Sequence, residues 1–355
     1  MPRPIVSVLI DTYNHERFIE DAIRSVLEQE FPVTDREIVL VDDGSTDGTP
    51  QILEKLGAEI RILRKANGGQ ASAFNHGIPE CQGEIIAFLD GDDWWRPQKL
   101  RRVVQSMTAN PSVGVLGHGI VEVSVDGSVR PQAPDKAERF RLNSLGAARV
   151  FRLRKSFLGT SRMAFRADIL RRIGRVPTAL TIEADEYLFT LGTALSETLI
   201  LPETLAFYRL HGSNLYSAGA RDRAGLRRKG QVLHTLASSL NSELPVYGVA
   251  PEIVQCVTEI VQAESDQIRL RLDGGFPWDT VHIERKIYRI MHEDAPASHR
   301  LFRSLTMIPA LVLPPRYFYA GRDWLSTNKW YKLIRRLFLP VPKTTRVAGP
   351  GEFRA

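Results

Sequence analysis

The chain has 355 residues, of which 43% are hydrophobic and 25% are charged, so we expect a soluble globular protein with a sizeable core, not a disordered chain. Its two cysteines, Cys81 and Cys256, belong to no CxxC or Cys/His cluster, which argues against a zinc site or a disulfide framework and favours a reducing, cytoplasmic setting. The N-terminal sequence has no signal-peptide pattern, and no apolar stretch has the length needed to span a bilayer.

The net charge of +6 is placed unevenly along the chain. From residue 300 onward there are eleven basic residues and only two acidic ones, Asp323 and Glu352. The first 299 residues hold the other 36 basic and 39 acidic residues. The body is therefore nearly neutral and the tail is strongly basic, so the two parts need separate explanations.

The first hundred residues alternate between strand and helix patterns. Short apolar runs bounded by polar or turn residues predict strands at 5–10, 37–41, 59–63 and 85–89. Apolar residues at helical spacing, or a proline that opens a helix, predict helices at 18–27, 50–56 and 71–76. This alternation predicts βαβ units and a mostly parallel sheet, with the carboxyl ends of the strands at one edge.

The predicted strands end in acidic or amide side chains. These are Asp11, Asp42, Asp43, Asn67, Asp90, Asp92 and Asp93. Carboxylates packed this closely repel one another and raise each other's pKa, so a cation is expected among them. Hard Mg²⁺ or Mn²⁺ binds one or two carboxylates together with phosphate oxygens and water. The alternative is a set of solvated turns and helix caps, for which Asp, Ser and Thr are also favoured.

Residues 5–100 resemble the nucleotide-sugar-binding half of a family 2 glycosyltransferase with the GT-A fold. Four stretches carry the resemblance in the family's order: Val6–Ile10 with Thr12–Asn14, Val41–Thr49, Asn67–Ala71 and Asp90–Asp93. Asp11 departs from the pattern, because such sequences usually have proline there. The resemblance implies an α/β, Rossmann-like, mostly parallel sheet flanked by helices and followed by a helical C-terminal region.

The resemblance also implies roles for individual residues. Those expected to bind the nucleotide sugar are Thr12, Tyr13, Asn14, Asp42, Asp43, Asn67, Gly68, Asp90 and Arg209, with Asp42 favoured over Asp43 as the contact to the base. The metal, Mn²⁺ or Mg²⁺, is expected at Asp92, with Asp90 and His211. The donor is a nucleotide-diphosphate sugar, and a UDP-sugar is favoured. For His211 alone, packing or capping after a strand is an equally good explanation.

Sugar transfer with inversion needs a carboxylate that deprotonates the acceptor hydroxyl. Residues 182–189, at the start of a predicted helix, resemble the family's acidic pair that precedes an aromatic residue and a leucine. Ala184 splits the pair here, so Asp185 is favoured as the base and Glu183 and Glu186 are the other candidates. The structural alternative is that acidic residues suit the first turn of any helix because of its dipole.

The middle of the chain predicts a helix at 97–109, strands at 113–116 and 120–125, and a hairpin turn at Asp126-Gly127. Residues 131–157 are poorly patterned, and we expect an irregular acceptor-side loop region there. A strand at 204–210, helical sequence at 219–272 with a break at 245–251, and a helix at 276–292 follow.

These patterns predict a catalytic domain at 1–215, a helical extension at 216–299 and a basic aromatic tail at 300–355. Tryptophan and tyrosine interleaved with Lys and Arg at 300–340 favour an anionic membrane surface as a partner, and packing of the rings on the body is the alternative. We expect no nucleic-acid partner, because no nucleic-acid-binding module is visible. The expected location is the cytoplasm, with peripheral contact to the inner face of the cytoplasmic membrane.

The sequence therefore favours a metal-dependent inverting glycosyltransferase that moves a sugar from a nucleotide-diphosphate donor to a glycan, lipid-linked or small acceptor. One alternative is a catalytically degenerate member that only binds a nucleotide sugar or a membrane. A second is a sugar nucleotidyltransferase, which usually has a glycine-rich loop with Arg or Lys after the first strand. Residues Asp11–Asn14 do not form such a loop.

Overall fold

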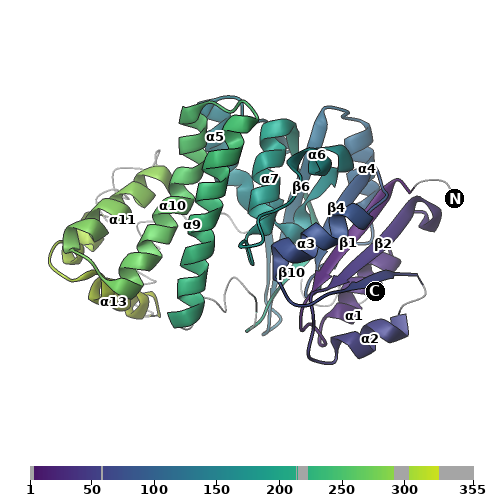
Figure 1. Ribbon diagram of the computed structural model, residues 1–355, viewed down its shortest axis with the longest axis horizontal. Coiled ribbons are helices and arrows are strands. Elements are labelled where there is room, and N and C mark those ends of the chain that lie inside the picture. The colour runs from purple at the N-terminus through teal and green to yellow at the C-terminus, as the bar shows by residue number, and fades with distance from the viewer. Residues whose placement is uncertain (1–3, 57–58, 213, 215–222, 292–303, 328–355) are drawn as a thin grey trace. The chain divides into compact units, whose positions relative to one another are not determined.

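The computed structural model of the chain describes residues 4–56, 59–212, 214, 223–291 and 304–327 (Figure 1). The chain divides into two compact units, Met1–Ser265 and Asp266–Ala355. The boundaries predicted at residues 215 and 299 lie within 215–222 and 292–303, outside the described residues, and they stay predictions.

The first unit is built on a mixed ten-stranded sheet, in which the strands follow the order β3-β2-β1-β4-β9-β6-β10-β5, with β7 beside β6 and β8 beside β10. The strands are β1 Val6–Thr12, β2 Arg36–Asp42, β3 Arg61–Arg64, β4 Ile85–Asp90, β5 Trp94–Trp95, β6 Val113–Ser124, β7 Val129–Gln132, β8 Glu138–Phe140, β9 Ala164–Arg166 and β10 Glu197–Leu210. Strands β1 to β4 are parallel, and β9 lies antiparallel between β4 and β6. Because β10 is parallel to β6, both run in the direction of β4, and the predicted mostly parallel sheet is confirmed.

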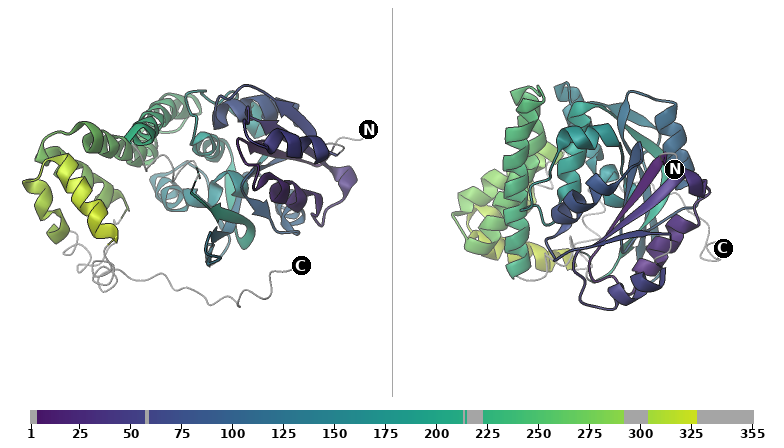
Figure 2. Two further views of the ribbon diagram at one scale, coloured as in Figure 1. Left: turned by 90° about the horizontal axis from the view of Figure 1, so that it is seen from below. Right: turned by 45° about the vertical axis from the view of Figure 1, so that its right-hand side comes forward.

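Helices lie on both faces of this sheet (Figure 2). The helices between β1 and β10 along the first unit are α1 Ile19–Leu27, α2 Thr49–Leu56, α3 Gln70–Gly77, α4 Lys99–Thr108, α5 Leu145–Arg154, α6 Ala167–Ile173 and α7 Ala184–Leu195. Helix α9 (Arg223–Val246) packs against α7, and α10 (Pro251–Asp273) ends beyond the boundary of the unit at Ser265. Both faces of β1 are buried: Val8 and Ile10 join a cluster with residues of α1, and Leu9 packs against Gly77 of α3. Such burial on two faces is typical of parallel strands covered by helices.

Two predictions in the middle of the chain were wrong. Residues 131–157 are not irregular, because they contain β8 and α5. The side chain of Ser144 caps α5 by accepting a hydrogen bond from the amide of Ala147 at 3.2 Å, and Phe151 packs against Phe140 and Phe189. The other error is that β6 is one strand, not two, since its Gly117–Gly119 stretch remains paired with β10 through bulges. Both features depend on partners far away in the sequence.

The second unit contains α11 (Pro277–Met291), a 3-10 turn at Ile308–Leu311 and α13 (Pro315–Thr327). Its small core is formed by Leu270, Val281, Ile283, Met307, Ala310, Phe318 and Tyr319. Arg322 pairs with the buried Glu284 at 2.7 Å, and Arg271 pairs with Asp323 at 2.5 Å. None of the helices within the described ranges is long and apolar enough to cross a bilayer.

Candidate active site

The carboxyl ends of β1, β2 and β4 lie side by side at one edge of the sheet. The strand register pairs Asp11 with Asp90 and Thr12 with Asp42. Asp92 and Asp93, which complete the acidic motif, follow β4 after Gly91. The predicted convergence of the strand ends is therefore confirmed by the pairing of the strands.

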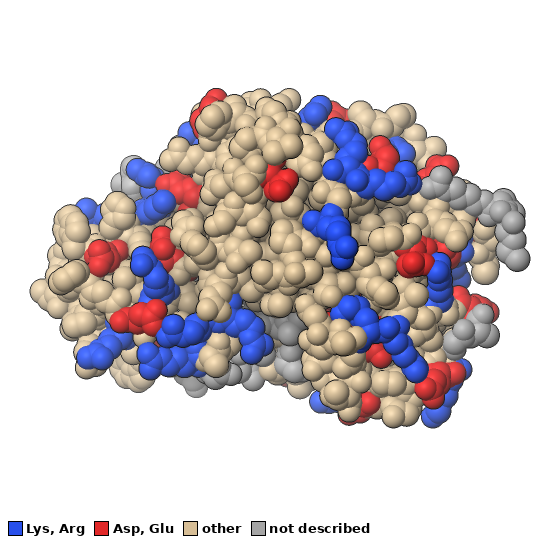
Figure 3. Space-filling view, in the orientation of Figure 1, with Lys and Arg blue, Asp and Glu red and all other residues tan. Residues whose placement is uncertain are grey.

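The site carboxylates are largely withdrawn from the surface. On the face drawn in Figure 3, acidic and basic side chains are interspersed in small groups. Burial, followed by the negative charge of neighbouring aspartates, raises the pKa of both Asp11 and Asp90 well above the usual range. Asp92 is among those neighbours for each of them, which makes the strand ends an acidic cluster. Asp11, the departure from the family pattern, is thus part of this cluster.

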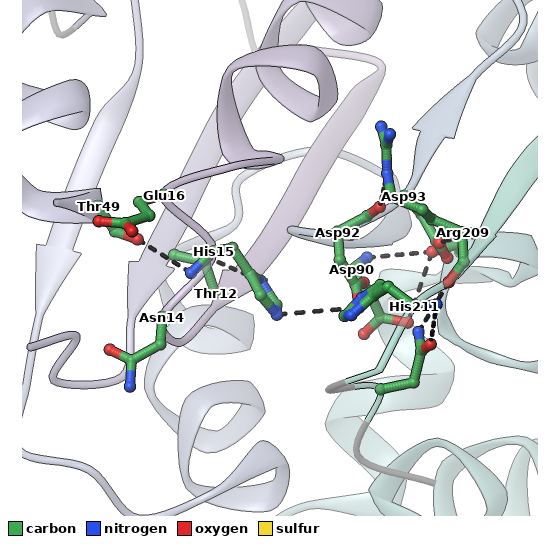
Figure 4. Close-up of polar contacts among 12 residues, drawn as sticks. Thr12, Asn14, His15, Glu16, Thr49, Asp90, Asp92, Asp93, Arg209 and His211 are labelled. Carbon is green, nitrogen blue, oxygen red and sulfur yellow. Dashed lines mark hydrogen bonds and ion pairs between the residues drawn. The ribbon is translucent and has the colours of Figure 1, made fainter. Parts of the chain in front are cut away.

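Asp92 faces two histidines (Figure 4). Its Oδ2 lies 3.0 Å from Nε2 of His211 and 3.8 Å from Nε2 of His15. Burial on its own would raise the pKa of Asp92, but the hydrogen bond from His211 and the charges of both rings outweigh it, so the pKa is lowered. Oγ1 of Thr12 lies 3.2 Å from Nδ1 of His15, and the His15 amide donates to Oγ1 of Thr49 at 3.0 Å. The sequence analysis did not identify His15 as a site residue, although it directly follows Thr12–Asn14.

The pair Asp92 and His211 fits a divalent cation. Adjacent ligands around an octahedral ion with bonds of about 2.1 Å lie about 3 Å apart, and Oδ2 of Asp92 and Nε2 of His211 are 3.0 Å apart. Within the part of the chain that the structure describes, no group of three or more His, Cys, Asp or Glu side chains is arranged to hold a metal on its own. A cation here would therefore take further ligands from phosphate oxygens and water, as Mg²⁺ usually does at nucleotide sites.

Arg209 holds the turn after β4 against β10. Its amide donates to Oδ1 of Asp93 at 2.9 Å, and its Nε donates to the carbonyl of Asp92 at 3.1 Å. The guanidinium pairs with Asp21 at 2.9 Å and lies 4.4 Å from the ring centroid of Trp94. Through these contacts Arg209 positions the acidic motif. Its predicted contact with phosphate stays a prediction.

Thr12, Tyr13 and Asn14 form the start of the loop after β1. Thr12 is buried and Tyr13 is 38% exposed. Asn14 adopts a left-handed conformation with φ of 57°, which asparagine tolerates better than most residues. Its Oδ1 accepts from the amide of Thr46 at 2.7 Å, and its amide donates to Oγ of Ser45 at 2.9 Å. Asn14 therefore joins the first and second motifs.

Asp42 and Asp43 are both buried but have different partners. Asp42 accepts from the amide of Ser45 at 2.9 Å, which caps the turn after β2. The Asp43 carboxylate accepts from the amides of Gly68 at 3.1 Å and Gly69 at 2.7 Å, and it pairs with Lys65. Asp43 thus fixes the third motif.

Close backbone packing completes the contact between the second and third motifs. Gly44 has φ of +77°, and a Cβ atom there would lie 2.7 Å from the amide nitrogen of Asn67. A side chain at Gly44 is therefore excluded by both conformation and space. The side chain of Asn67 is exposed at this junction.

Asp185 lies in the first turn of α7, held by three donors. Its Oδ2 accepts from the amide of Thr160 at 3.1 Å and from Oγ1 of Thr160 at 3.2 Å, and its Oδ1 accepts from the amide of Glu186 at 2.8 Å. Burial raises the pKa of Asp185. Its charge in turn contributes to the raised pKa values of Asp11 and Asp90, so α7 brings Asp185 to the strand-end cluster.

Gln70 connects this carboxylate to the third motif. Its Nε2 donates to Oγ1 of Thr160 at 3.0 Å, and its Oε1 accepts from the amide of Ala184 at 3.0 Å. The sequence indicated that Gln70 belongs to a motif. It gave no sign that Gln70 contacts Thr160 and the start of α7, because Thr160 lies in no recognisable pattern.

The two other candidate bases have different surroundings. Glu186 pairs with Lys155 at 2.5 Å. Glu183 precedes α7 in a left-handed conformation with φ of 62°, an uncommon state for a residue with a side chain. Burial, and then the charges of Glu186 and Asp185, raise the pKa of Glu183 to about 8.

Lys99 is a buried lysine beneath the site that sequence reasoning also missed. Its Nζ donates to the carbonyl of Ser161 at 2.7 Å and lies 3.7 Å from the ring centroid of Trp95. Oγ of Ser161 accepts from the amide of Asp90 at 3.1 Å, so Lys99 supports the end of β4 through Ser161. Burial lowers the pKa of Lys99 well below its usual range. The sequence signal that could have indicated its burial is that Lys99 lies four positions before the buried Val103, on the same face of the helix.

Comparison with known proteins identifies the family of the chain. Residues 7–174 match the model of glycosyl transferase family 2. Over 233 residues the chain is 34% identical to an uncharacterized glycosyltransferase of Nostoc sp., covering 64% of this chain and 71% of that protein. The chain belongs to glycosyltransferase family 2. It is accordingly a glycosyltransferase enzyme.

Solved structures share the fold of this family 2 glycosyltransferase. Staphylococcus aureus TarS 1–349 in complex with UDP-GlcNAc has a TM-score of 0.56 at 21% identity, over 86% of each chain. The mannosyltransferase PcManGT of Pyrobaculum calidifontis, in complex with GDP-Man and Mn²⁺, has a TM-score of 0.53 at 20% identity, over 95% of this chain and 84% of that chain. The predicted GT-A-like fold is confirmed.

Proposed function

We propose that this glycosyltransferase moves a sugar, with inversion, from a nucleotide-diphosphate sugar to an acceptor hydroxyl, and that it uses Mn²⁺ or Mg²⁺. The observation that carries the proposal is the arrangement of Asp92 and His211, 3.0 Å apart, next to a buried acidic cluster. A separate carboxylate, Asp185, approaches the same cluster from α7. Donor activation and acceptor deprotonation thus have different groups within one site.

The donor is proposed to lie over the first, second and third motifs. Residues that would border the nucleotide are Thr12, Tyr13, Asn14, Asp42, Asp43, Asn67, Gly68 and Asp90. The tight packing of these motifs on one another, through Asn14 and Asp43, supports a preformed surface for a nucleoside. TarS in complex with UDP-GlcNAc and PcManGT in complex with GDP-Man support a nucleotide sugar as donor, and we favour a UDP-sugar.

The diphosphate is proposed to meet Asp92 and His211 with a divalent cation between them. When bound, the cation supplies positive charge that stabilises the negative charge developing on the departing nucleoside diphosphate. The mannosyltransferase PcManGT, which was solved with Mn²⁺, supports this choice of ion. Arg209 fixes the position of Asp92 by its hydrogen bond to the Asp92 carbonyl at 3.1 Å.

Asp185 is proposed as the general base. Inverting transfer takes place in one displacement, so the chain needs a group that accepts the hydroxyl proton and needs no nucleophile of its own. A carboxylate whose pKa is raised by burial binds that proton more tightly than a solvated one. The hydrogen bonds from Thr160 and Glu186 fix its orientation, which such proton transfer requires.

The acceptor is proposed to be the hydroxyl of a carbohydrate or of a lipid-linked saccharide. The basic aromatic residues at 300–340 support an anionic membrane surface as a further partner. Part of that segment, residues 304–327, lies within the described second unit.

The first experiment is thermal unfolding of the purified protein with UDP-, GDP-, dTDP- and CMP-sugars, each with and without Mn²⁺. A ligand at a hundred times its dissociation constant stabilises by about 2.7 kcal/mol. We expect one nucleotide class to raise the melting temperature only when the metal is present. Asp92→Asn should abolish the metal-dependent rise, and Asp168→Asn, which removes an exposed carboxylate on α6, should preserve it.

Transfer is then measured with the donor identified in this way and a panel of saccharide acceptors. Stabilisation by a nucleotide sugar without any transfer would replace the proposal by a degenerate, binding-only member of the family. A metal-dependent rise that survives Asp92→Asn would remove Asp92 from the metal site.

A further inference from the structure

The second unit exposes a large number of apolar side chains for its size. Six of them are Phe276, Trp278, Leu311, Val312, Tyr317 and Trp324, with exposed fractions of 77%, 66%, 52%, 74%, 55% and 66%. Ten large hydrophobic side chains are exposed within its described ranges, 266–291 and 304–327, against nine in the much longer described part of the first unit. Exposed apolar surface concentrated in this way marks an interaction site.

The exposed residues come from two segments that meet. A Cβ atom on Gly275 would lie 3.9 Å from Cγ of Pro315, so the chain entering α11 contacts the first residue of α13. Phe276 and Trp278 follow Gly275, and Tyr317 follows Pro315. Phe276, Trp278 and Tyr317 therefore lie in one region of the second unit.

The exposed side chains are not a substitute for a missing core. Helix α13 places Phe318 and Tyr319 in the small core of the unit, at 6% and 1% exposure, and leaves Tyr317 and Trp324 on the surface. All three side chains of the run Leu311-Val312-Leu313, which leads from the end of the 3-10 turn toward α13, are exposed. The unit thus has both a buried apolar side and a separate exposed one.

The charge of this part of the chain identifies the partner. From residue 300 onward, eleven basic residues are accompanied by two acidic ones. One of the two, Asp323, is already paired with Arg271. Arg316 is exposed, with its guanidinium 4.8 Å from the ring centroid of Tyr317. The sequence of the whole second unit, 266–355, has sixteen basic and eight acidic residues, and such an excess of positive charge attracts anionic headgroups.

We propose that Phe276, Trp278, the run 311–313, Tyr317 and Trp324 form a docking surface for the interface of an anionic lipid bilayer. Tryptophan and tyrosine rings are favoured at headgroup depth, where one end is apolar and the other is wet. Aliphatic side chains enter the acyl boundary, and basic residues remain among the headgroups. The inference deepens the membrane partner named under the proposed function and does not depend on sugar transfer.

The test is co-sedimentation of the full-length protein with phosphatidylcholine vesicles that contain or lack phosphatidylglycerol. We expect binding to the anionic vesicles, weakened by salt and weaker to pure phosphatidylcholine. The double variant Trp278→Ser/Trp324→Ser should lower the vesicle affinity by about tenfold or more for each ring removed. The matched control Val125→Ser/Val246→Ser changes side chains that are 84% and 74% exposed in the first unit, and it should leave the affinity unchanged.

Two further measurements decide what a loss of binding means. The melting temperature and the stabilisation by nucleotide sugar should be the same for the tryptophan variant and for the unmodified chain, which shows that the fold and the donor site are intact. Equal loss in the control variant, or no binding of the unmodified chain to anionic vesicles, would overturn the proposal. A dimer that becomes a monomer in the tryptophan variant, measured by light scattering, would instead assign the surface to contact between copies and overturn the membrane assignment.

Discussion

Asp185→Asn is the sharpest perturbation of the proposed chemistry, because it changes one atom of a carboxylate whose partners are all hydrogen-bond donors. Oδ2 accepts twice from Thr160, and Oδ1 accepts from the amide of Glu186. An asparagine side chain can place its oxygen on only one of these sides. Its NH₂ group then faces a backbone N–H on the other side, and one part-buried hydrogen bond is lost.

The cost in stability follows from that single lost bond. A buried donor left without its acceptor costs about 1–3 kcal/mol. At about 2–4 °C per kcal/mol for a unit of this size, the melting temperature falls by a few degrees and the protein stays folded. Donor binding should be retained, since Asp185 is not a member of the proposed metal pair. The rate of transfer should fall by about 10²–10⁴, the contribution of a positioned general base.

The assay compares initial rates of transfer at saturating donor for the unmodified chain, Asp185→Asn and Glu186→Gln. The second variant removes the same charge one residue away, where the carboxylate is paired with Lys155. Its rate should stay within about tenfold of the unmodified chain, since general-base losses reach 10²-fold or more. If Asp185→Asn transfers sugar at a normal rate, or if Glu186→Gln loses as much, the assignment of the base is wrong.

The pH profile gives an independent reading of the same carboxylate. A base is active when deprotonated, so kcat/KM rises with pH through the pKa of that group in the free enzyme. Burial raises the pKa of Asp185, which places the acidic limb at a higher pH than for a solvated aspartate, ordinarily about 3.9. An acidic limb at or below that ordinary value would contradict the buried position of the base.

Two further predictions concern backbone conformation and thiol reactivity. Gly69→Ala should lower the free energy of unfolding by more than about 1–3 kcal/mol, because φ is +80° and the new Cβ would lie 2.7 Å from Cα of Thr181. The control Gly127→Ala, at φ +78° with nothing within 4 Å of the new Cβ, should show the conformational cost alone. Equal losses in thermal unfolding would refute the steric argument. Burial raises the pKa of the Cys81 thiol to about 12, so a thiol reagent at pH 8 should leave Cys81 unmodified in the folded protein. The variant Cys256→Ser should then show no labelling under native conditions. Persistent labelling of Cys256→Ser would refute the protection of Cys81.

Local patterns were sufficient to predict the first half of the fold and the position of the site within it. The four parallel strands each carry a short apolar run that ends in polar residues, and strands joined by right-handed crossovers bring those ends to one edge. The pairing of Asp11 with Asp90 and of Thr12 with Asp42 follows from that topology. The resemblance of four short motifs then led to the family, which the comparisons show.

The sequence by itself thus determined strands β1 to β4, their acidic edge and the class of enzyme, because each depends on residues near one another in the chain. Only the tertiary structure decided which side chains meet at this acidic edge. Asp92 faces His211 from 119 positions away, and Gln70 reaches Thr160 across 90 positions. Such contacts have no local signature, since they are set by where β10 lies in the sheet and how α7 packs on it, and packing depends on the whole core. The same dependence turned residues 138–154 into a strand and a helix where local patterns indicated neither.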